Sequence, residues 1–273
     1  MPNGDGHILS IDGLGVSYGG VQAVCDVTLD VAPSEIVGIV GESGSGKSSM
    51  LRAVGGLLGP GGTVNAGSIR YMAEQRMAFV FQDAVASLDP LFKIGAQFDE
   101  CLAANASQVV RARGTGDGGL PSAPRARELE RTVLREVGLD DPDRVLASYP
   151  HNLSGGMCQR VALAMAVACQ PALLLADEPT SALDVTTQRQ VSELLLRIRR
   201  DHGTAMLVVS HNIGAISLIA DRIGVMYRGR LVELGESDQV LHAPNHPYTR
   251  NLIAAVPRTD GSLPKLPEAW EGA

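Results

Sequence analysis

One short glycine-rich segment constrains the fold of this chain more than any other feature. Residues 41–48 read Gly-Glu-Ser-Gly-Ser-Gly-Lys-Ser, which matches the pattern G-x-x-x-x-G-K-S/T. The run before it, residues 35–40, is apolar after Glu35 and predicts a buried strand, and residues 49–54 predict the first turns of a helix. Strand, glycine loop and helix form the context in which a backbone wraps closely around a phosphate group. The sequence therefore predicts a phosphate-binding loop.

Each part of this loop has an expected role. Its backbone amides and the positive end of the following helix attract phosphate oxygens. Lys47 is expected to reach the β- and γ-phosphates of a nucleotide, and the Ser48 hydroxyl is expected to bind Mg²⁺. The predicted nucleotide contacts of this segment are Gly41, Ser43, Gly44, Ser45, Gly46, Lys47, Ser48 and Ser49.

An accidental match to the pattern is the alternative, because the chain contains 31 glycines. The lysines argue against an accident. Lys47, Lys93 and Lys265 are the only lysines of the chain, and one of them stands where the pattern requires it.

Composition limits the class of protein. A chain of 273 residues that is 45% hydrophobic can build a sizeable core in one large domain or two small ones. Its net charge of −7 argues against a surface whose main task is nucleic-acid binding. The cysteines form no C-x-x-C pair, so we interpret them as small, semi-buried residues of a reducing compartment.

The sequence predicts no membrane span of its own. The longest apolar run, residues 161–169, is far shorter than the ~20 residues that cross a bilayer. Residues 1–10 lack the basic start and the apolar centre of a signal peptide. We expect a cytoplasmic chain, and any membrane role must come through a partner.

Hydrophobic patterns divide the chain into strands and helices. Alternating stretches within residues 8–31 predict antiparallel strands with a turn at residues 18–20. The fully apolar run 172–176 predicts a buried parallel strand, and residues 205–210, which are apolar up to Ser210, predict another buried strand. Further expected elements are a loop at 55–67, strands at 67–71 and 77–81, a turn at 85–90, helices at 94–104, 125–137, 153–169, 185–201 and 212–220, a hairpin at 223–233, a flexible loop at 111–124 and a poorly ordered tail from 262.

A second group of residues completes a nucleotide-hydrolysis site. Such a site needs a metal-binding carboxylate at the carboxyl end of a buried strand beside the phosphate loop. Asp177 follows the apolar run 172–176 and fits this requirement, and Glu178 could polarise an attacking water. An acidic pair at a strand end is usually just solvent-facing, but Pro179-Thr180-Ser181-Ala182-Leu183-Asp184 follows here and favours the functional interpretation.

With these motifs in order, the chain resembles the ATP-binding subunit of ABC transporters from about residue 8 to residue 257. The most specific mark is Leu153-Ser154-Gly155-Gly156-Met157, which is similar to the family signature LSGGQ with Met in the last place. The start of a helix at Ser154, Gly155 and Gly156 would in any case form an anion site. In the family, this signature closes over the γ-phosphate held by a second ATPase subunit.

The resemblance implies roles for individual residues. Tyr18 would stack on adenine, although a half-buried turn aromatic is the alternative, and Gln82 would contact Mg²⁺ and the water and sense the membrane subunit. Glu178 would be the general base, and His211 would contact the γ-phosphate. Asp184 would belong to a loop that couples two ATP sites. Ser48, Gln82 and Asp177 form the expected Mg²⁺ site.

The fold that the resemblance implies is α/β: a P-loop NTPase (RecA-like) core with an N-terminal antiparallel β-subdomain and a helical insert subdomain. The expected ATP-binding core comprises residues 1–83 and 170–235, the helical subdomain residues 84–169, and a family-specific C-terminal extension residues 236–273.

The C-terminal stretch narrows the resemblance. His246-Pro247-Tyr248-Thr249-Arg250-Asn251-Leu252 with Ala255-Val256-Pro257 is similar to the ATPases of peptide and nickel importers, although a helix start with proline is the alternative. Cys158 departs from the Arg or Lys of many members. No cysteine follows Cys169, so the iron–sulphur cluster of many oligopeptide ATPases is not expected.

We therefore expect an ATP-hydrolysing subunit, on the cytoplasmic face of the membrane, that drives uptake of a peptide, nickel or similar small solute. The implied partners are a second ABC ATPase, two transmembrane permease subunits and, indirectly, an extracytoplasmic solute-binding protein. The alternative is a soluble ABC ATPase that acts on ribosomes or nucleic acid. The acidic net charge and the single set of motifs disfavour it.

Overall fold

The computed structural model describes residues 6–72, 76–105, 123–181 and 183–255, which form two compact units. Residues 1–73 and 205–273 form the first, here called the loop unit, and residues 74–204 form the second, the helical unit. The tail predicted from residue 262, Val256-Pro257 and all but the last two residues of the loop predicted at 111–124 lie outside the described residues.

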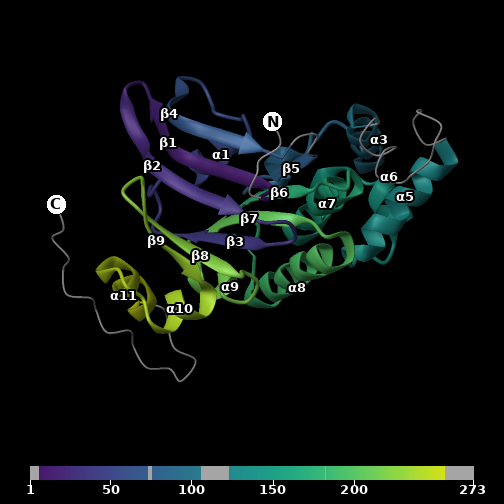
Figure 1. Ribbon diagram of the computed structural model, residues 1–273. Helices are drawn as coiled ribbons and strands as arrows, with labels where there is room; N and C mark the ends of the chain where they lie inside the picture. The colour runs from purple at the N-terminus through teal and green to yellow at the C-terminus, as the bar shows by residue number, and fades with distance from the viewer. Residues whose placement is uncertain (1–5, 73–75, 106–122, 182, 256–273) are drawn as a thin grey trace. The chain divides into compact units, whose positions relative to one another are not determined.

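An antiparallel sheet forms the first layer of the loop unit. Its strands are β1 (Leu9–Tyr18), β2 (Val21–Val31) and β4 (Gly62–Tyr71), in the order β2-β1-β4 (Figure 1). The turn between β1 and β2 is confirmed, with positive φ at Gly19 and Gly20. The loop predicted at 55–67 is wrong from Gly62 onward. Most of β4 is exposed, so its side chains show no alternation, and its pairing with β1 defines the strand.

A buried sheet forms the second layer of the loop unit. The strands β3 (Ile36–Val40), β7 (Ala205–Ser210), β8 (Arg222–Tyr227) and β9 (Arg230–Glu236) lie in the order β7-β3-β8-β9. β3 is parallel to both β7 and β8, and every residue of β3 and β7 is buried, as their apolar runs predicted. The predicted hairpin is confirmed as β8 and β9, which pair antiparallel.

Four helices lie in the described part of the loop unit. They are α1 (Lys47–Val54), α9 (Ile213–Ile216), α10 (Ser237–His242) and α11 (Pro247–Ala254). The helix predicted at 212–220 is wrong in extent, because the helix proper ends at Ile216. Asn212 caps its start by accepting a hydrogen bond from the Ala215 amide at 3.2 Å.

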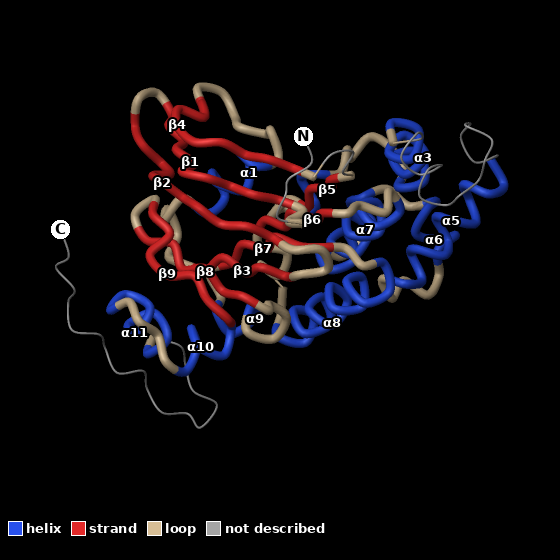
Figure 2. Tube along the Cα trace, in the orientation of Figure 1, coloured by secondary structure: helices blue, strands red, loops and turns tan. Residues whose placement is uncertain are grey.

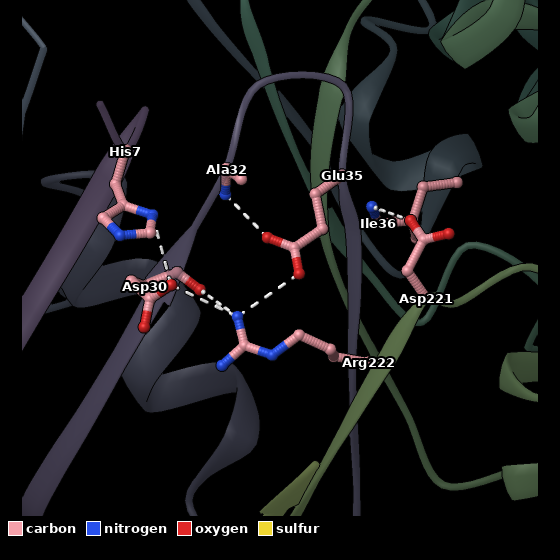
Figure 3. A network of polar contacts seen from close by, with 7 residues as sticks. All are labelled: His7, Asp30, Ala32, Glu35, Ile36, Asp221 and Arg222. Carbon is pink, nitrogen blue, oxygen red and sulfur yellow. Dashed lines mark hydrogen bonds and ion pairs between the residues drawn. The ribbon is translucent and has the colours of Figure 1, made fainter. Parts of the chain in front are cut away.

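A charged network joins the amino ends of the buried strands to the antiparallel sheet (Figure 3). Arg222, which begins β8, donates to Asp30 of β2 at 3.2 Å and to Glu35 at 3.3 Å. Glu35 also accepts from the Ala32 amide at 2.6 Å, which closes the turn into β3. Since β3 starts at Ile36, this network fixes the end of the strand opposite to the phosphate loop.

The helical unit surrounds two short parallel strands, β5 (Met77–Val80) and β6 (Leu173–Asp177). Its helices, blue in Figure 2, are α2 (Ala84–Ser87), α3 (Ile94–Ala104), α5 (Ala123–Glu136), α6 (Pro142–Ala147), α7 (Gly155–Ala168) and α8 (Val185–His202), with a 3₁₀ turn η1 (Pro150–Asn152). The helices predicted at 94–104 and 185–201 are confirmed within one residue. The turn predicted at 85–90 is partly wrong, because Asp83 caps the short helix α2 with a 2.9 Å bond from Ala86 N–H.

The core of the helical unit lies around α7. This helix packs against α3 and α5, and its buried side chains include Val161 and Leu163. No helix within the described ranges is long and apolar enough to span a bilayer.

Candidate functional site

The predicted phosphate loop connects β3 to α1 in the loop unit. Gly41 leaves the strand with φ +156°, and a Cβ there would lie 2.2 Å from the Met226 carbonyl oxygen. Gly46 has φ +100°, and a Cβ there would lie 2.5 Å from the Ala23 carbonyl oxygen. Both positions therefore accept only glycine. The Gly229 amide, in the β8–β9 turn, binds the Ser45 carbonyl at 2.9 Å, so the loop rests on the neighbouring hairpin.

Lys47 is the first residue of α1, and its side chain is buried against the loop. Its ammonium group donates to the carbonyl oxygens of Gly41 and Glu42, both at 2.8 Å, and to the Ser45 hydroxyl at 3.3 Å. Ser48 and Ser49 follow in the first turn of the same helix. The charge of Lys47 and the helix N-terminus thus act at one place, which suits a nucleotide phosphate.

His211 reaches the same sheet edge as the phosphate loop. Val40 of β3 pairs with Ser210 of β7, and the two strands are parallel, so Gly41 and His211 leave the sheet side by side. The Ser210 hydroxyl accepts a hydrogen bond from the Asn212 amide at 3.0 Å, which shapes the turn that carries His211.

Tyr18 lies at the end of β1 and is half-buried. It pairs with Gly62 of β4, where a Cβ would lie 2.7 Å from the ring carbon Cε1 of Tyr18. One part of the ring is therefore covered by backbone. The stacking of Tyr18 on adenine stays a prediction.

The second group of predicted residues lies in the helical unit. Val80 of β5 pairs with Ala176 of β6, so the residues that follow the two strands share one edge. There the Gln82 side-chain amide donates to the Glu178 carboxylate at 3.3 Å. Asp177 is fully buried and Glu178 is 9% exposed.

Glu178 has an unusual backbone. Its φ is +47°, in the left-handed region that non-glycine residues rarely adopt. The Glu178 carbonyl accepts hydrogen bonds from the amide and the hydroxyl of Ser181, both at 3.0 Å, and these bonds hold the turn. Strained backbone of this kind concentrates at functional sites.

The predicted signature begins α7. Ser154 is the N-cap, and its hydroxyl accepts from the Met157 amide at 3.3 Å. Ser154 and Gly155 are exposed, whereas a Cβ on Gly156 would lie 3.2 Å from the Thr187 methyl of α8. A pocket of about 410 Å³ adjoins this helix start and includes Arg160. Asp140 and Asp141 line the same pocket, so the suitability for an anion rests on the exposed helix N-terminus.

Asp184 caps α8. Its carboxylate accepts from the Thr187 amide at 3.0 Å and from the Thr187 hydroxyl at 2.6 Å. These bonds, the hydroxyl first, hold the pKa of Asp184 below its usual range. The structure therefore assigns Asp184 a capping role, and the coupling role stays a prediction.

The residues fit a nucleotide with a hard metal ion. The glycine loop, the buried lysine and the helix N-terminus match a polyphosphate. No cluster of three or more His, Cys, Asp or Glu residues that could hold a metal occurs in the described part of the chain. Mg²⁺ is usually held by one or two carboxylates together with phosphate oxygens and water, and Asp177 is a buried carboxylate of this kind at the end of β6.

Sequence reasoning missed one residue at this site. Tyr248 of α11 is buried, and its hydroxyl contacts the phosphate loop at the Glu42 amide. The motif that carries it, His246-Pro247-Tyr248-Thr249, was recognised as a family mark, but it gave no sign of a contact across 206 positions.

The fold and the loop define a phosphate-binding α/β protein, and comparison with known proteins identifies its family. A family model described as "ABC transporter" matches residues 24–181. A second, described as "Oligopeptide/dipeptide transporter, C-terminal region", matches residues 232–272. The chain belongs to the ABC transporter ATP-binding family and is an ATPase of the ABC type.

Individual relatives agree. The dipeptide transport ATP-binding protein DppD of Escherichia coli is 39% identical over 92% of this chain and 78% of its own length. Its Bacillus subtilis namesake is 37% identical over 93% and 78%. The oligopeptide transport ATP-binding protein AmiE of Streptococcus pneumoniae is 36% identical over 87% and 68%.

Solved structures confirm the fold. The ATP-binding cassette MJ0796, as a dimer in a post-hydrolysis state bound to ADP and Pi, has a TM-score of 0.67 and 26% identity. The match covers 84% of this chain and 98% of that one. CbiO1 from Clostridium perfringens has a TM-score of 0.68 at 23% identity, over 91% and 96%.

Proposed function

We propose that this chain is the ATPase subunit of an importer that takes up a short peptide or a similar small solute through two membrane subunits. The carrying observation is the match of residues 232–272 to the C-terminal region of oligopeptide and dipeptide transporters. Relatives named for dipeptide, oligopeptide and glutathione transport support a peptide over nickel as the solute. The ribosome-acting alternative has no such support.

We propose the following roles in ATP hydrolysis for the residues of each unit. In the loop unit, Lys47 and the loop amides would bind the β- and γ-phosphates, and Ser48 would be a ligand of Mg²⁺. In the helical unit, Gln82 and Asp177 would be Mg²⁺ ligands, as the family resemblance implies, and the ion would neutralise phosphate charge. Glu178 takes a proton from the attacking water. The observed bond from Gln82 to Glu178 orients that carboxylate.

We further propose that two ATPase subunits close around ATP. The exposed start of α7, at Ser154 and Gly155, supplies amides and a helix dipole suited to a γ-phosphate bound by the other subunit. The chain has one phosphate loop and one signature, so a head-to-tail pair completes two sites. A dimeric cassette among the similar structures supports this arrangement.

A rigid apolar surface on the helical unit suits the membrane subunits. Leu91 is 79% exposed and Phe92 is 56% exposed. Gln97 of α3 holds their loop by accepting from the Asp89 amide at 2.9 Å and donating to the Phe92 carbonyl at 2.9 Å. Exposed apolar side chains on a braced loop are typical of a protein contact. A position on the cytoplasmic face of the membrane follows from this proposal.

Uptake by the reconstituted transporter tests the proposal. Vesicles that contain the chain and its membrane subunits, with ATP and Mg²⁺ on the side of the ATPase, should accumulate a labelled dipeptide when the solute-binding protein is added. Lys47→Ala should abolish uptake. Arg200→Ala, which removes an exposed cation paired with Asp201, is the control and should leave uptake unchanged.

Two results would contradict the proposal. One is dipeptide uptake that continues without ATP or with Lys47→Ala. The other is the absence of any membrane partner together with co-purification with ribosomes in high salt, which would favour the alternative function.

A further inference from the structure

One glutamate of the ATPase core holds the start of the C-terminal helix α11. Glu233 of β9 accepts hydrogen bonds from the backbone amides of Asn245 at 2.8 Å and His246 at 3.1 Å. Burial alone would raise the pKa of Glu233, but the Thr249 hydroxyl and these amides outweigh burial and lower it. A buried, charged acceptor therefore fixes the chain where α11 begins.

The start of α11 then aims one aromatic residue inward. His246 caps the helix, with its Nδ1 accepting from the Tyr248 amide at 3.2 Å, and Pro247 occupies the first turn. The Tyr248 side chain is 5% exposed, and its ring lies against Tyr227 with the centroids 4.3 Å apart. Tyr227 ends β8 directly after Met226, whose carbonyl restricts Gly41.

The Tyr248 hydroxyl reaches the phosphate loop itself. It accepts a hydrogen bond from the Glu42 amide at 3.3 Å. The carbonyl of the same residue, Glu42, accepts from the Lys47 ammonium group at 2.8 Å, as does the Gly41 carbonyl. One short piece of backbone thus joins the C-terminal helix to the lysine that is expected to bind phosphate.

The Tyr248 hydroxyl holds the Glu42 backbone from outside the loop, whereas the Glu42 carbonyl is held from within the loop by the Lys47 ammonium group and by the Ser45 amide at 3.2 Å. The middle of the loop is held by the bond from the Gly229 amide to the Ser45 carbonyl. Glu42 is exposed at its side chain, and Gly44 has open space around it. Burial raises the pKa of Tyr248, so the phenol is neutral at physiological pH and can accept this bond.

We propose that residues 237–254 act as a strut for the phosphate loop, and that Tyr248 is a positioning residue for ATP. Its hydroxyl holds the Glu42 backbone in the form that presents Lys47. A loop that is already ordered loses less freedom when ATP binds, so affinity is higher. This inference rests on the ATP-binding role of Lys47 and not on which solute is transported.

The substitution Tyr248→Phe separates positioning from packing. Phenylalanine keeps the ring and its contact with Tyr227 but removes the hydroxyl. We expect the Kd of the full-length chain for MgATP, measured by titration calorimetry, to rise about two- to tenfold, as loss of one hydrogen bond predicts. In the assembled transporter, the KM for ATP should rise by a similar factor while kcat changes by less than about twofold.

Tyr71→Phe is a matched control in the same unit. The Tyr71 hydroxyl donates to the Val54 carbonyl at the far end of α1, away from the phosphate loop. Its loss should lower the melting temperature and leave the Kd for MgATP unchanged. A purely structural role for Tyr248 would give the same pattern.

Three outcomes would overturn the proposal. The Kd of the Tyr248→Phe variant could equal that of the wild type, or Tyr71→Phe could raise the Kd by the same factor. Wild-type chain that binds no MgATP would overturn the nucleotide site and the strut together. MgATP binding is measured without a transported solute. A raised Kd of the Tyr248→Phe variant would therefore support the strut even if the transporter failed to take up a peptide.

Discussion

The substitution Glu178→Gln is the sharpest test of the catalytic assignment. Glutamine has nearly the same volume as glutamate and keeps one carbonyl oxygen, so it can still accept the 3.3 Å bond from Gln82. The left-handed backbone at this position, φ +47°, is no harder for glutamine than for glutamate. The change therefore removes a proton acceptor and a negative charge with little structural cost.

We expect a loss of about 10²- to 10⁴-fold in kcat, the usual contribution of a positioned general base. That range corresponds to roughly 3–5.5 kcal/mol of activation free energy. The KM for ATP should stay within a few-fold of the wild type, because Lys47 and the loop are untouched. The assay is phosphate release by the assembled transporter, with ATP in excess.

Glu193→Gln is the matched control. Glu193 lies on α8 of the same unit, is 59% exposed and pairs with Arg189 at 3.1 Å. An exposed pair of this kind contributes little, so turnover should be unchanged. If Glu178→Gln retained wild-type turnover, Glu178 would not be the base. If both variants lost activity equally, the loss would be due to charge in general.

Two further predictions concern stability. Replacing Arg222 by Met leaves Asp30 and Glu35 without their guanidinium partner. The free energy of unfolding, measured with urea, should fall by roughly 1–3 kcal/mol, less than for a fully buried pair because Arg222 is 20% exposed. An unchanged urea midpoint would contradict the bracing role of this network. Burial first, then the neighbouring Asp99, raises the pKa of Glu130 in α5 from 4.5 to about 7. The folded state then holds this proton more tightly, so wild-type stability falls as pH rises from about 4.5 to 7. Over that pH range, the free energy of unfolding of Glu130→Gln should rise relative to the wild type by on the order of 2–3 kcal/mol. A difference in melting temperature between the two proteins that stays constant from pH 4 to 8 would refute this reasoning.

Those parts of the fold that combine local pattern with burial were predictable. Apart from Glu35 and Ser210, the runs 35–40 and 205–210 hold no polar side chain, because both faces of β3 and β7 are covered. The strand, loop and helix around Lys47 follow from one motif. Ile94–Ala104 was predicted to the residue, since one face of α3 is buried along its length.

The elements that were missed depend on backbone pairing or on contacts distant in sequence. The strand predicted at 67–71 is the second half of β4; its first half, from Gly62, was missed because its exposed side chains give no pattern and only its ladder with β1 defines it. The short helix α2 depends on a single cap at Asp83. Cys101 and Cys169 lie 68 positions apart, yet their sulphur atoms are 3.7 Å from each other. A short stretch of sequence cannot show that two residues so far apart in the chain lie close together.

For the candidate site, the sequence identified the residues but not how they are arranged in space. Motifs predicted which residues to examine, and strand register explains why some of them meet. Pairing of Val40 with Ser210 brings the phosphate loop and His211 to one edge, and pairing of Val80 with Ala176 does the same for Gln82 and Glu178. The domain boundaries predicted at 83, 169 and 235 and the roles inherited from the family stay predictions.

The contact at Tyr248 changes how the C-terminal extension is understood. Its sequence marks a family of transporters, yet its nearest chemical consequence is a hydrogen bond to the phosphate loop. We infer that a segment that holds Glu42 affects ATP affinity and not the step proposed for Glu178. Disturbance of the extension should therefore raise the KM for ATP, whereas disturbance of Glu178 should lower kcat. These opposite signatures allow the two assignments to be tested in one set of variants.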